Sequence, residues 1–294
     1  MKTTVKTSKI KMSLRRKWFL ILLLIGLISF FIYKGNTTVG VTRYEIVSDK
    51  IPDNYDKYTI VQISDLHDAE FGENHSDVVS RVKMITPQAI FITGDFIDSS
   101  RYDLEKSLIL IEELQFVAPI YYVTGNHEIA TQDMDRIRGA LEDLGVRVLS
   151  NEADIITLFP DSSIAIGGID DPLASELEDD EAVRISIKQA FENIPDEMFK
   201  VLLSHRPEQF DVYAEVGIDV TFSGHAHGGQ FRIPGIGGLV SPGQGWFPTY
   251  SSGVHEKNSS HLVVSRGLGN SIIPVRLFNQ PEIVVVTLRK IEES

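Results

Sequence analysis

The chain of 294 residues contains no cysteine. This absence excludes disulfides and thiolate metal sites, so any transition metal has to be held by imidazole and carboxylate groups. Mn, Fe and Zn suit such ligands, whereas a zinc-finger site does not. The absence of cysteine is compatible with either side of a membrane, including an oxidising exterior.

Acidic residues are absent before Glu45. An apolar run of 16 residues, Trp18 to Tyr33, follows a basic flank and predicts a short membrane anchor or a signal peptide. No Ala-x-Ala pattern follows the run, which favours an uncleaved anchor over export with a cleaved signal. The flank would stay in the cytoplasm, so the remaining chain is expected outside it. The flanking bases are Lys2, Lys6, Lys9, Lys11, Arg15, Arg16 and Lys17.

Positive charge is scarce beyond the anchor. Eight of the 28 basic residues lie in residues 1–34, so the other 20 face all 41 acids, a net charge of −21. So acidic a domain excludes nucleic-acid binding through a basic groove, and it needs metal ions to hold an anionic substrate. We expect a membrane anchor over 1–34, a tether over 35–57 and one large domain over 58–294, acting as a monomer.

Side chains with metal-binding groups follow five apolar segments that we predict to be strands, over 59–64, 89–93, 119–124, 199–203 and 220–222. Open α/β sheets place their ligands at the carboxyl ends of strands. One such end, the His-x-His pair, would equally suit a polar turn, but five ends predict one shared site. The residues after these strands include Asp65, His67, Asp95, Asn126, His127, Glu128, His205, His225 and His227.

The first half of the domain alternates strands with predicted helices over 77–85, 103–116 and 132–144, with Ser76 as the cap of the first. This order implies parallel strands with right-handed crossovers. An alternating stretch over 39–47 predicts an edge strand in the tether. The second half is richer in strands, and residues 235–253 are expected to form a long surface loop because they are rich in Gly and Pro.

The blocks Asp-x-His, Gly-Asp, Gly-Asn-His-Glu, His and Gly-His-x-His, in this order over residues 58–288, resemble the calcineurin-like metallophosphoesterase superfamily. Residues 228–234 and 265–271 resemble its bacterial membrane-associated branch, that of the YkuE and YaeI phosphodiesterases. The resemblance implies an α/β fold, a four-layer α-β-β-α sandwich of two mixed sheets, preceded here by one N-terminal transmembrane or signal-anchor helix.

The resemblance also implies two divalent transition-metal ions bridged by Asp95. They would lower the pKa of a bridging water, so that hydroxide attacks a phosphoester. His127 would donate the proton or stabilise the transition state, and Glu128 would orient a histidine unless it is a solvated turn carboxylate. The first ion would be held by Asp65, His67, Asp95 and His227, and the second by Asp95, Asn126, His205 and His225.

Three residues are expected to contact substrate. Arg232 and Arg266 could bind phosphate oxygens as planar forks, or form structural ion pairs instead. Trp246, with Phe247 and Tyr250, would form an apolar wall at the cleft mouth or pack against the domain. The remaining acids and histidines near the motifs are expected to be solvated or to pack at the surface, and they are Asp68, Asp98, His75, His255 and His261.

The sequence therefore predicts a metal-dependent phosphoester hydrolase, with a phosphodiester as the expected substrate. The anchor suggests that this substrate is lipid- or nucleotide-linked and lies near the membrane. A non-catalytic metal-binding or scaffold protein of the same fold is the alternative, and a dinuclear hydrolase acting on amides is another.

Overall fold

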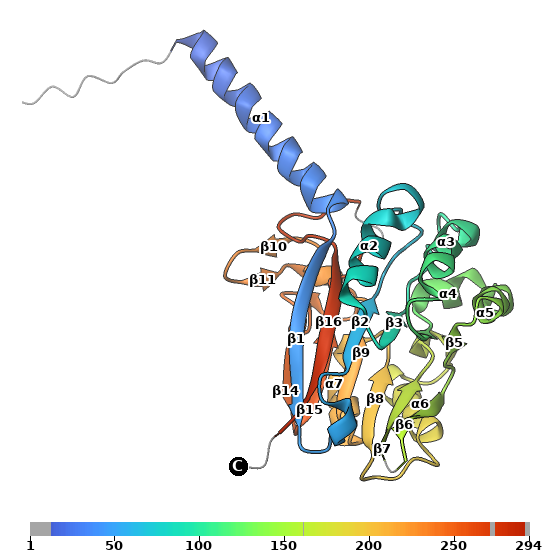
Figure 1. The fold of residues 1–294 in the computed structure, drawn as a ribbon. Coiled ribbons are helices and arrows are strands. Elements are labelled where there is room, and N and C mark those ends of the chain that lie inside the picture. Colours follow the sequence, from blue (N-terminus) through green and yellow to red (C-terminus); the bar gives the residue numbers. More distant parts are fainter. Residues whose placement is uncertain (1–12, 161, 271–273, 292–294) are drawn as a thin grey trace, which may run out of the picture.

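The structure, a computed structural model, describes residues 13–160, 162–270 and 274–291. Two six-stranded sheets form its centre (Figure 1). The first contains, in spatial order, β1 (Gly40–Ser48), β16 (Glu282–Lys290), β2 (Thr59–Ile63), β3 (Ala89–Thr93), β4 (Ile120–Val123) and β5 (Arg147–Val148). The second contains β14 (Gly253–Lys257), β15 (Ser260–Val264), β9 (Val220–Ser223), β8 (Phe199–Leu203), β7 (Ser162–Gly168) and β6 (Glu152–Phe159).

Both sheets are mixed. The strands β2 to β5 pair in parallel, as the alternation of strands and helices predicts. Antiparallel pairs join β16 to β2, β6 to β7 and β14 to β15. The central strands read as continuous apolar runs because both of their faces are covered, and every residue of β3 and β8 is buried.

The two sheets pack face to face over one apolar core. Ile60 and Phe91 of the first sheet meet Val201 and Phe222 of the second, and all four side chains are fully buried. The rings of Phe91 and Phe222 lie edge to face, with centroids 5.0 Å apart. Such a pair adds about 0.5–1.5 kcal/mol beyond the burial of its area.

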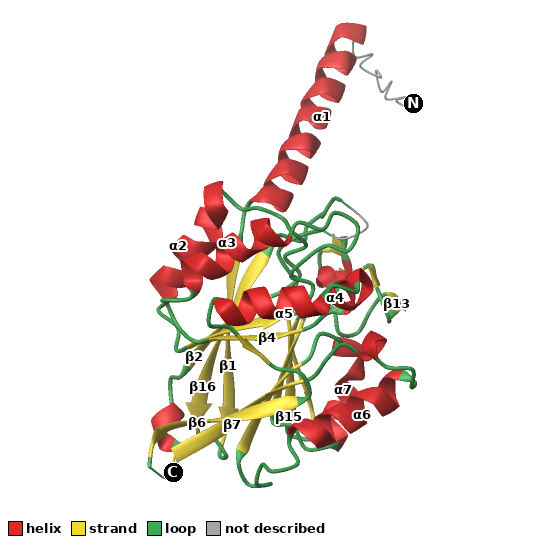
Figure 2. Cartoon of the chain, turned by 90° about the vertical axis from the view of Figure 1, so that its right-hand side faces the viewer, coloured by secondary structure: helices red, strands yellow, loops and turns green. Residues whose placement is uncertain are grey.

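Helices cover the outer faces of both sheets (Figure 2). The first sheet is covered by α2 (Ser76–Ile85), α3 (Leu104–Leu114) and α5 (Met134–Asp143). The second is covered by α6 (Asp179–Ala190) and α7 (Phe210–Glu215). Their apolar faces, such as Leu108 and Ile111 of α3, complete two further cores. The predicted four-layer sandwich is confirmed.

One long helix, α1 (Leu14–Thr37), projects away from the sandwich (Figure 1). None of its described side chains is buried, and it is long and apolar enough to cross a membrane. Its 24 residues span about 36 Å, more than the hydrocarbon core of a bilayer. The helix exceeds the predicted apolar run at both ends and fits a transmembrane or anchor helix. The bases Lys2, Lys6, Lys9 and Lys11 lie outside the described residues.

The edge strand predicted in the tether is confirmed as β1, which pairs in parallel with β16. The predicted helix over 132–144 is wrong at its start. The chain forms a short helix, α4 (Asn126–Thr131), and then α5, because Gln132 adopts a left-handed conformation with φ 55° and ends α4. Ser76 is not the cap of α2 but lies inside it, after the left-handed His75.

The loop predicted over 235–253 is shorter than expected. Two small antiparallel pairs occupy this region, β10 (Arg232–Ile233) with β11 (Gly237–Gly238) and β12 (Val240–Ser241) with β13 (Gly245–Trp246). Glycines at positive φ supply the tight turns between these short strands, for example Gly235 at φ 82°.

Phe222→Ala should destabilise the domain by about 3–5 kcal/mol, because it opens a cavity between the two sheets. Urea unfolding of the full chain in detergent micelles measures the effect. Phe116→Ala is the matched control, because Phe116 is 90% exposed. Equal losses for the two variants would contradict the core described here.

Candidate metal centre

The carboxyl ends of five central strands meet at one edge of the sandwich. Residues after β2 and β3 come together with residues after β4, β8 and β9, so both sheets contribute. Their side chains include two groups that share Asp95, and within each group the ligand atoms lie within 4.8 Å of one another. The first group is Asp65, His67, Asp95 and His227, and the second is Asp95, His205 and His225.

The first group is compact and buried. His67 Nε2 lies 3.1 Å from His227 Nε2 and 3.6 Å from Asp95 Oδ2. His227 Nε2 also lies 3.4 Å from Asp65 Oδ1. All four residues are at most 5% exposed. Two ring nitrogens and two carboxylates thus converge on one point.

The second group lies beside the same oxygen of Asp95. His205 Nε2 lies 3.2 Å from Asp95 Oδ2, and His225 Nδ1 lies 3.2 Å from His205 Nε2. Asn126, the first residue of α4, completes the predicted ligands, but it belongs to neither group of His, Asp and Glu side chains. The Asp95 carboxylate therefore lies between the two groups of histidines.

Unpaired polar atoms at this site indicate what it can hold. Among the described residues, Asp65 Oδ2 and Asn126 Oδ1 are buried without a hydrogen-bond partner. Such atoms cost about 1–3 kcal/mol each unless a partner satisfies them. The donor set of imidazole nitrogens and carboxylate and amide oxygens suits divalent transition metals. The residues present therefore fit two metal ions.

The backbone at the site is held in a sparsely populated conformation. Five of the predicted ligands have left-handed φ angles between 46° and 63°. Non-glycine residues adopt this region rarely, and several such residues together mark functional sites. These ligands are Asp65, His67, Asp95, His225 and His227.

The glycines of two motifs allow the ligands to approach. A Cβ atom on Gly94 would lie 2.6 Å from His205 Nδ1, and one on Gly125 would collide with Asp95 Oδ1. Gly94 also has φ 83°. The glycine before each ligand in Gly-Asp and Gly-Asn-His-Glu is therefore required by close packing at the site.

Burial and mutual attraction set the charges of the site. Burial raises the pKa of Asp65 to about 6 and lowers the pKa of His67 to about 3. Burial also opposes a charge on His205, but Asp95 overcomes this and raises the pKa of His205 to about 10. Burial would raise the pKa of Asp95 too, but His205 holds it well below its usual range. The buried charge of Asp95 is thus balanced by His205 in the protein alone, and a bound cation could balance it instead.

Glu128 supports the backbone of the segments that carry the predicted ligands. It is fully buried, and its carboxylate accepts hydrogen bonds from the backbone N–H groups of Asp95, Phe96, Ile97 and Gly125 at 2.6–3.1 Å. Burial and the charge of Asp95 raise the pKa of Glu128 to about 7. The alternative of a solvated turn carboxylate is wrong. These four bonds come from the backbone that carries the predicted ligands rather than from a histidine.

His127 lies beside the first group, with its ring centroid 4.5 Å from that of His67. The backbone N–H of Ser99 donates to His127 Nδ1 at 3.0 Å. Because Nδ1 accepts this bond, the proton of a neutral ring lies on Nε2. This tautomer presents an N–H at Nε2, which can donate a hydrogen bond to the oxygen of a leaving group.

The acids Asp68 and Asp98 are not solvated, contrary to expectation. Asp68 is 6% exposed and accepts bonds from the backbone of Asp98 and from the Ser107 hydroxyl, at 2.8 and 2.7 Å. Asp98 is 2% exposed and pairs with Arg101. Both order the loop after β3, and Asp98 also lies within 4.8 Å of His67 and His127 ligand atoms.

The other histidines outside the motifs pack as expected. His75 is fully buried, with Nε2 3.1 Å from the carbonyl oxygen of Lys106. His255 lies half-buried against the ring of Tyr250, with centroids 5.1 Å apart. His261 is half-buried on β15.

Two arginines at the site were missed by the sequence analysis. Arg206 forms a bidentate ion pair with buried Asp171, and its Nη1 lies 3.3 Å from His225 Nε2. Arg276 is fully buried, with Nη2 3.4 Å from His227 Nδ1. Arg206 directly follows a predicted ligand, which is a signal in the sequence, whereas Arg276 has none.

The three expected substrate contacts lie in different environments. Arg266 pairs with buried Glu282, and Arg232 Nη1 donates to the Gly228 carbonyl oxygen at 2.9 Å. Trp246 is 73% exposed. Tyr250 packs edge to face on Phe210, so it belongs to the domain rather than to an apolar wall.

Glu128→Gln should weaken the site, because the amide NH₂ group would face backbone N–H donors. Each N–H left unsatisfied costs about 1–3 kcal/mol, so both thermal stability and metal retention should fall. Calorimetry and metal analysis of the purified variant measure these effects. Glu113→Gln is the control, because Glu113 forms an exposed pair with Lys83. Unchanged stability and metal content in Glu128→Gln would contradict the supporting role.

Comparisons with known proteins agree with this geometry. The chain is 28% identical to the metallophosphoesterase YkuE of Bacillus subtilis over 255 residues, covering 85% of this chain and 86% of YkuE. It is 26% identical over 244 residues to the phosphodiesterase YaeI of Escherichia coli, covering 80% and 84%. It is 28% identical over 261 residues to a Bos taurus transmembrane protein with a metallophosphoesterase domain, covering 85% of this chain and 57% of that protein.

The crystal structure of TT1561 of Thermus thermophilus shares the fold, with a TM-score of 0.50 at 12% identity over 72% of this chain and 90% of that one. The model of the calcineurin-like phosphoesterase family matches residues 58–229, which is more than half of the chain. The predicted superfamily and branch are confirmed. The ligand clusters lie at the strand ends where the motifs predict them, and the chain belongs to the calcineurin-like phosphoesterase family.

Proposed function

We propose that this protein is a phosphodiesterase that uses two divalent transition-metal ions to hydrolyse phosphoesters. The observation that carries the proposal is the position of Asp95, whose Oδ2 atom lies 3.6 Å from His67 Nε2 and 3.2 Å from His205 Nε2. One carboxylate between two groups of histidines is suited to two neighbouring ions. The relative YaeI bears the name phosphodiesterase, which supports the choice of diesters.

Two ions at this site would lower the pKa of a water molecule enough to supply hydroxide at neutral pH, and they would hold phosphate oxygens. The first would take Asp65, His67, Asp95 and His227 as ligands, and the second Asp95, Asn126, His205 and His225. Mn, Fe and Zn all suit these ligands.

His127 acts on the leaving group in this proposal. As the imidazolium it would give its Nε2 proton to the leaving alkoxide and remain as the neutral ring, or the neutral ring would stabilise the transition state by donating a hydrogen bond from Nε2. The backbone of Ser99 fixes the ring through Nδ1, so that Nε2 remains the donor. Glu128 takes no part in the chemistry and acts through the backbone that carries Asp95.

Substrate binding involves the surroundings of the site. A cavity of about 320 Å³ borders His67, and the bases Arg101 and Lys106 line it together with the acids Asp68 and Asp103. We propose that the two bases bind a phosphate group there. We propose Arg232, Arg266 and Trp246 as further contacts. Arg266 would have to exchange its bond to Glu282 for a substrate oxygen, whereas Trp246 is already exposed. A lipid- or nucleotide-linked phosphodiester suits this arrangement. The basic side chains near the ions would bind its phosphate, and the exposed ring of Trp246 would contact the group linked to the phosphate.

The alternative, a non-catalytic metal-binding or scaffold protein of this fold, would be expected to have lost ligands. Every residue expected to be a ligand is present in the sequence. A panel of phosphomonoesters, phosphodiesters and pyrophosphates with Mn, Fe and Zn decides between the two. The absence of hydrolysis across the panel, with both ions bound, would favour the scaffold.

The protein prepared without chelators should contain close to two metal ions per chain. Asp95→Asn should weaken both ions and abolish hydrolysis, because it removes the charge that both groups face. Metal analysis of the wild type and of Asp95→Asn, after dialysis against the same metal, measures this. Asp154→Asn is the control, because Asp154 forms an exposed pair with Arg147. Retention of one ion at full occupancy in Asp95→Asn would contradict a bridging role.

His127→Ala should keep both ions and lower the rate by about 10²–10⁴, the usual range for a general acid. An aryl ester with a good leaving group should lose less, since its alkoxide needs little protonation. Steady-state kinetics on an alkyl and an aryl phosphodiester, with metal analysis, measures both effects. Loss of an ion, or equal losses on the two esters, would remove His127 from this role.

We also propose that α1 spans the cell membrane once and that the catalytic domain lies outside the cytoplasm. The basic flank before the apolar run supports this orientation. Protease added to intact cells should then digest the domain, and the N-terminal sequence should show no cleavage after Tyr33. A domain protected until the cells are lysed would reverse the orientation, and a new N-terminus after Tyr33 would indicate export with a cleaved signal.

A further inference from the structure

Four exposed apolar side chains gather where α1 joins the domain. Ile233 and Ile236 lie on the β10–β11 hairpin and are 38% and 67% exposed, and Leu277 and Phe278 are 37% and 65% exposed. We call these four residues the apolar collar. Figure 1 shows the hairpin at the end of the domain from which α1 leaves. Phe278 borders both a cavity beside the hairpin and a cavity beside α1, so the four residues form one surface.

The collar is attached to α1 by hydrogen bonds. In the last turns of α1, the Asn36 side chain accepts from the backbone N–H of Arg276 at 2.9 Å and donates to its carbonyl oxygen at 3.2 Å. Leu277, the next residue, accepts a bond from the backbone of Arg232 at 2.9 Å. The hairpin, the segment around Leu277 and the end of α1 are therefore one connected unit.

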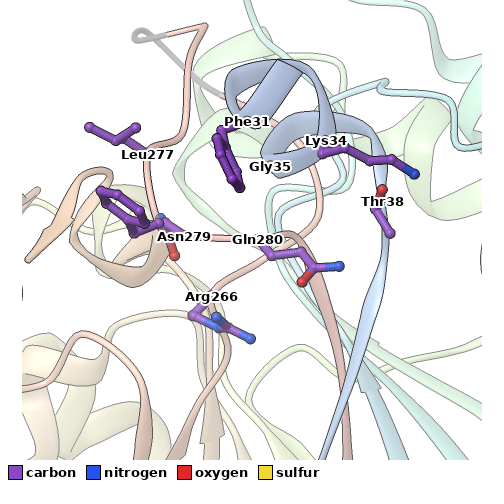
Figure 3. A pocket seen from close by; sticks show the side chains of 9 residues that line it. Phe31, Lys34, Gly35, Thr38, Arg266, Leu277, Asn279 and Gln280 are labelled. Carbon is purple, nitrogen blue, oxygen red and sulfur yellow. The ribbon is translucent and has the colours of Figure 1, made fainter. Parts of the chain in front are cut away.

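A cavity of about 480 Å³ lies between α1 and the collar (Figure 3). Phe31 and Lys34 of α1 form one wall, Leu277 lies on another side, and Arg266 lies below them. Phe278 also lines this cavity. Among the residues that the structure describes, those that line this cavity and the neighbouring one at the hairpin include no acid. An apolar surface with basic side chains beside it is the composition that contacts the interface of an anionic membrane.

The charge of this region differs from the rest of the domain. Glu256 is the only acid between residues 220 and 281, in a chain that has 41 acids. This stretch contains the hairpin and the segment around Leu277. An anionic leaflet repels an acidic domain. A stretch almost free of acids beside α1 reduces this repulsion where the domain would lie closest to the lipid.

From these observations we propose that the apolar collar inserts into the lipid leaflet that α1 enters, so that the domain rests on the bilayer instead of hanging from a free tether. The bilayer is the occupant because the collar is continuous with α1, which fits a membrane-spanning helix. Lys34 and Arg232 would meet the phosphate groups of the lipids.

Docking of the collar would also fix the metal centre relative to the bilayer. Asn279, one residue after the collar, donates to the carbonyl oxygen of His227 at 2.6 Å, and Arg276, one residue before it, contacts the His227 ring. The same segment therefore holds a predicted metal ligand and the membrane-contacting side chains.

Site-directed fluorescence tests the proposal on the full chain. The protein has no cysteine, so Ile236→Cys introduces a single labelling position for an environment-sensitive fluorophore. The labelled chain is reconstituted through α1 into vesicles of phosphatidylcholine and phosphatidylglycerol, with and without lipids that carry a quencher in the acyl chain. Ile185→Cys on α6 is the matched control, because Ile185 is an isoleucine with 50% exposure.

The label at position 236 should emit at shorter wavelength and lose roughly half its intensity to the quencher lipids, as expected for side chains about 5–10 Å deep in the interface. The label at 185 should do neither, and a label at Phe278→Cys should repeat the result at 236. Equal, weak quenching at 236, 278 and 185 would overturn the proposal. A blue shift without lipid quenching, growing with the protein-to-lipid ratio, would also overturn it, because a second copy would then cover the collar.

Discussion

The Asp95 carboxylate is the interaction on which the site depends. It is buried among histidines that both sheets contribute, His67 from the first and His205, His225 and His227 from the second. A buried charge is stable only where opposite charge or strong hydrogen bonds compensate it. His205 supplies the positive charge in the protein alone, and cations would do so in the loaded site. The loop that carries Asp95 is in turn held by three backbone hydrogen bonds to Glu128, and a fourth bond, from Gly125, ties Glu128 to the loop after β4. The two sheets must therefore pack in one register for the site to exist.

The parts of the fold with a strong local signal could be predicted from the sequence. The central strands are apolar on both faces and end in polar residues, so β2, β3, β8 and β9 lie almost where they were expected. Parallel pairing in the first half follows from the alternation of strands and helices. The grouping of the predicted metal ligands could also be predicted, because parallel strands place their carboxyl ends at one edge of a sheet.

Features decided by contacts between distant residues could not be predicted. The break between α4 and α5 depends on the left-handed Gln132, which has no glycine or proline signal. Asp68 and Asp98 stand in a loop and were expected to be solvated. Both are buried, with Ser107 as a partner of Asp68 and Arg101 as a partner of Asp98. Arg276 contacts His227 only because the segment that carries Arg276 packs against the residues that follow β9. Sequence neighbours carry no information on such long-range contacts.

The pairing of β1 with β16 has a consequence for how the domain is made. β1, the strand that follows α1, pairs in parallel with β16, and β16 also lies between β1 and β2. On a ribosome, α1 and β1 are made well before β16. The first sheet therefore cannot close until β16 has been made, and until then the edges of β1 and β2 that pair with β16 are open. The long apolar helix of a nascent chain is thus complete before the domain beside it can fold.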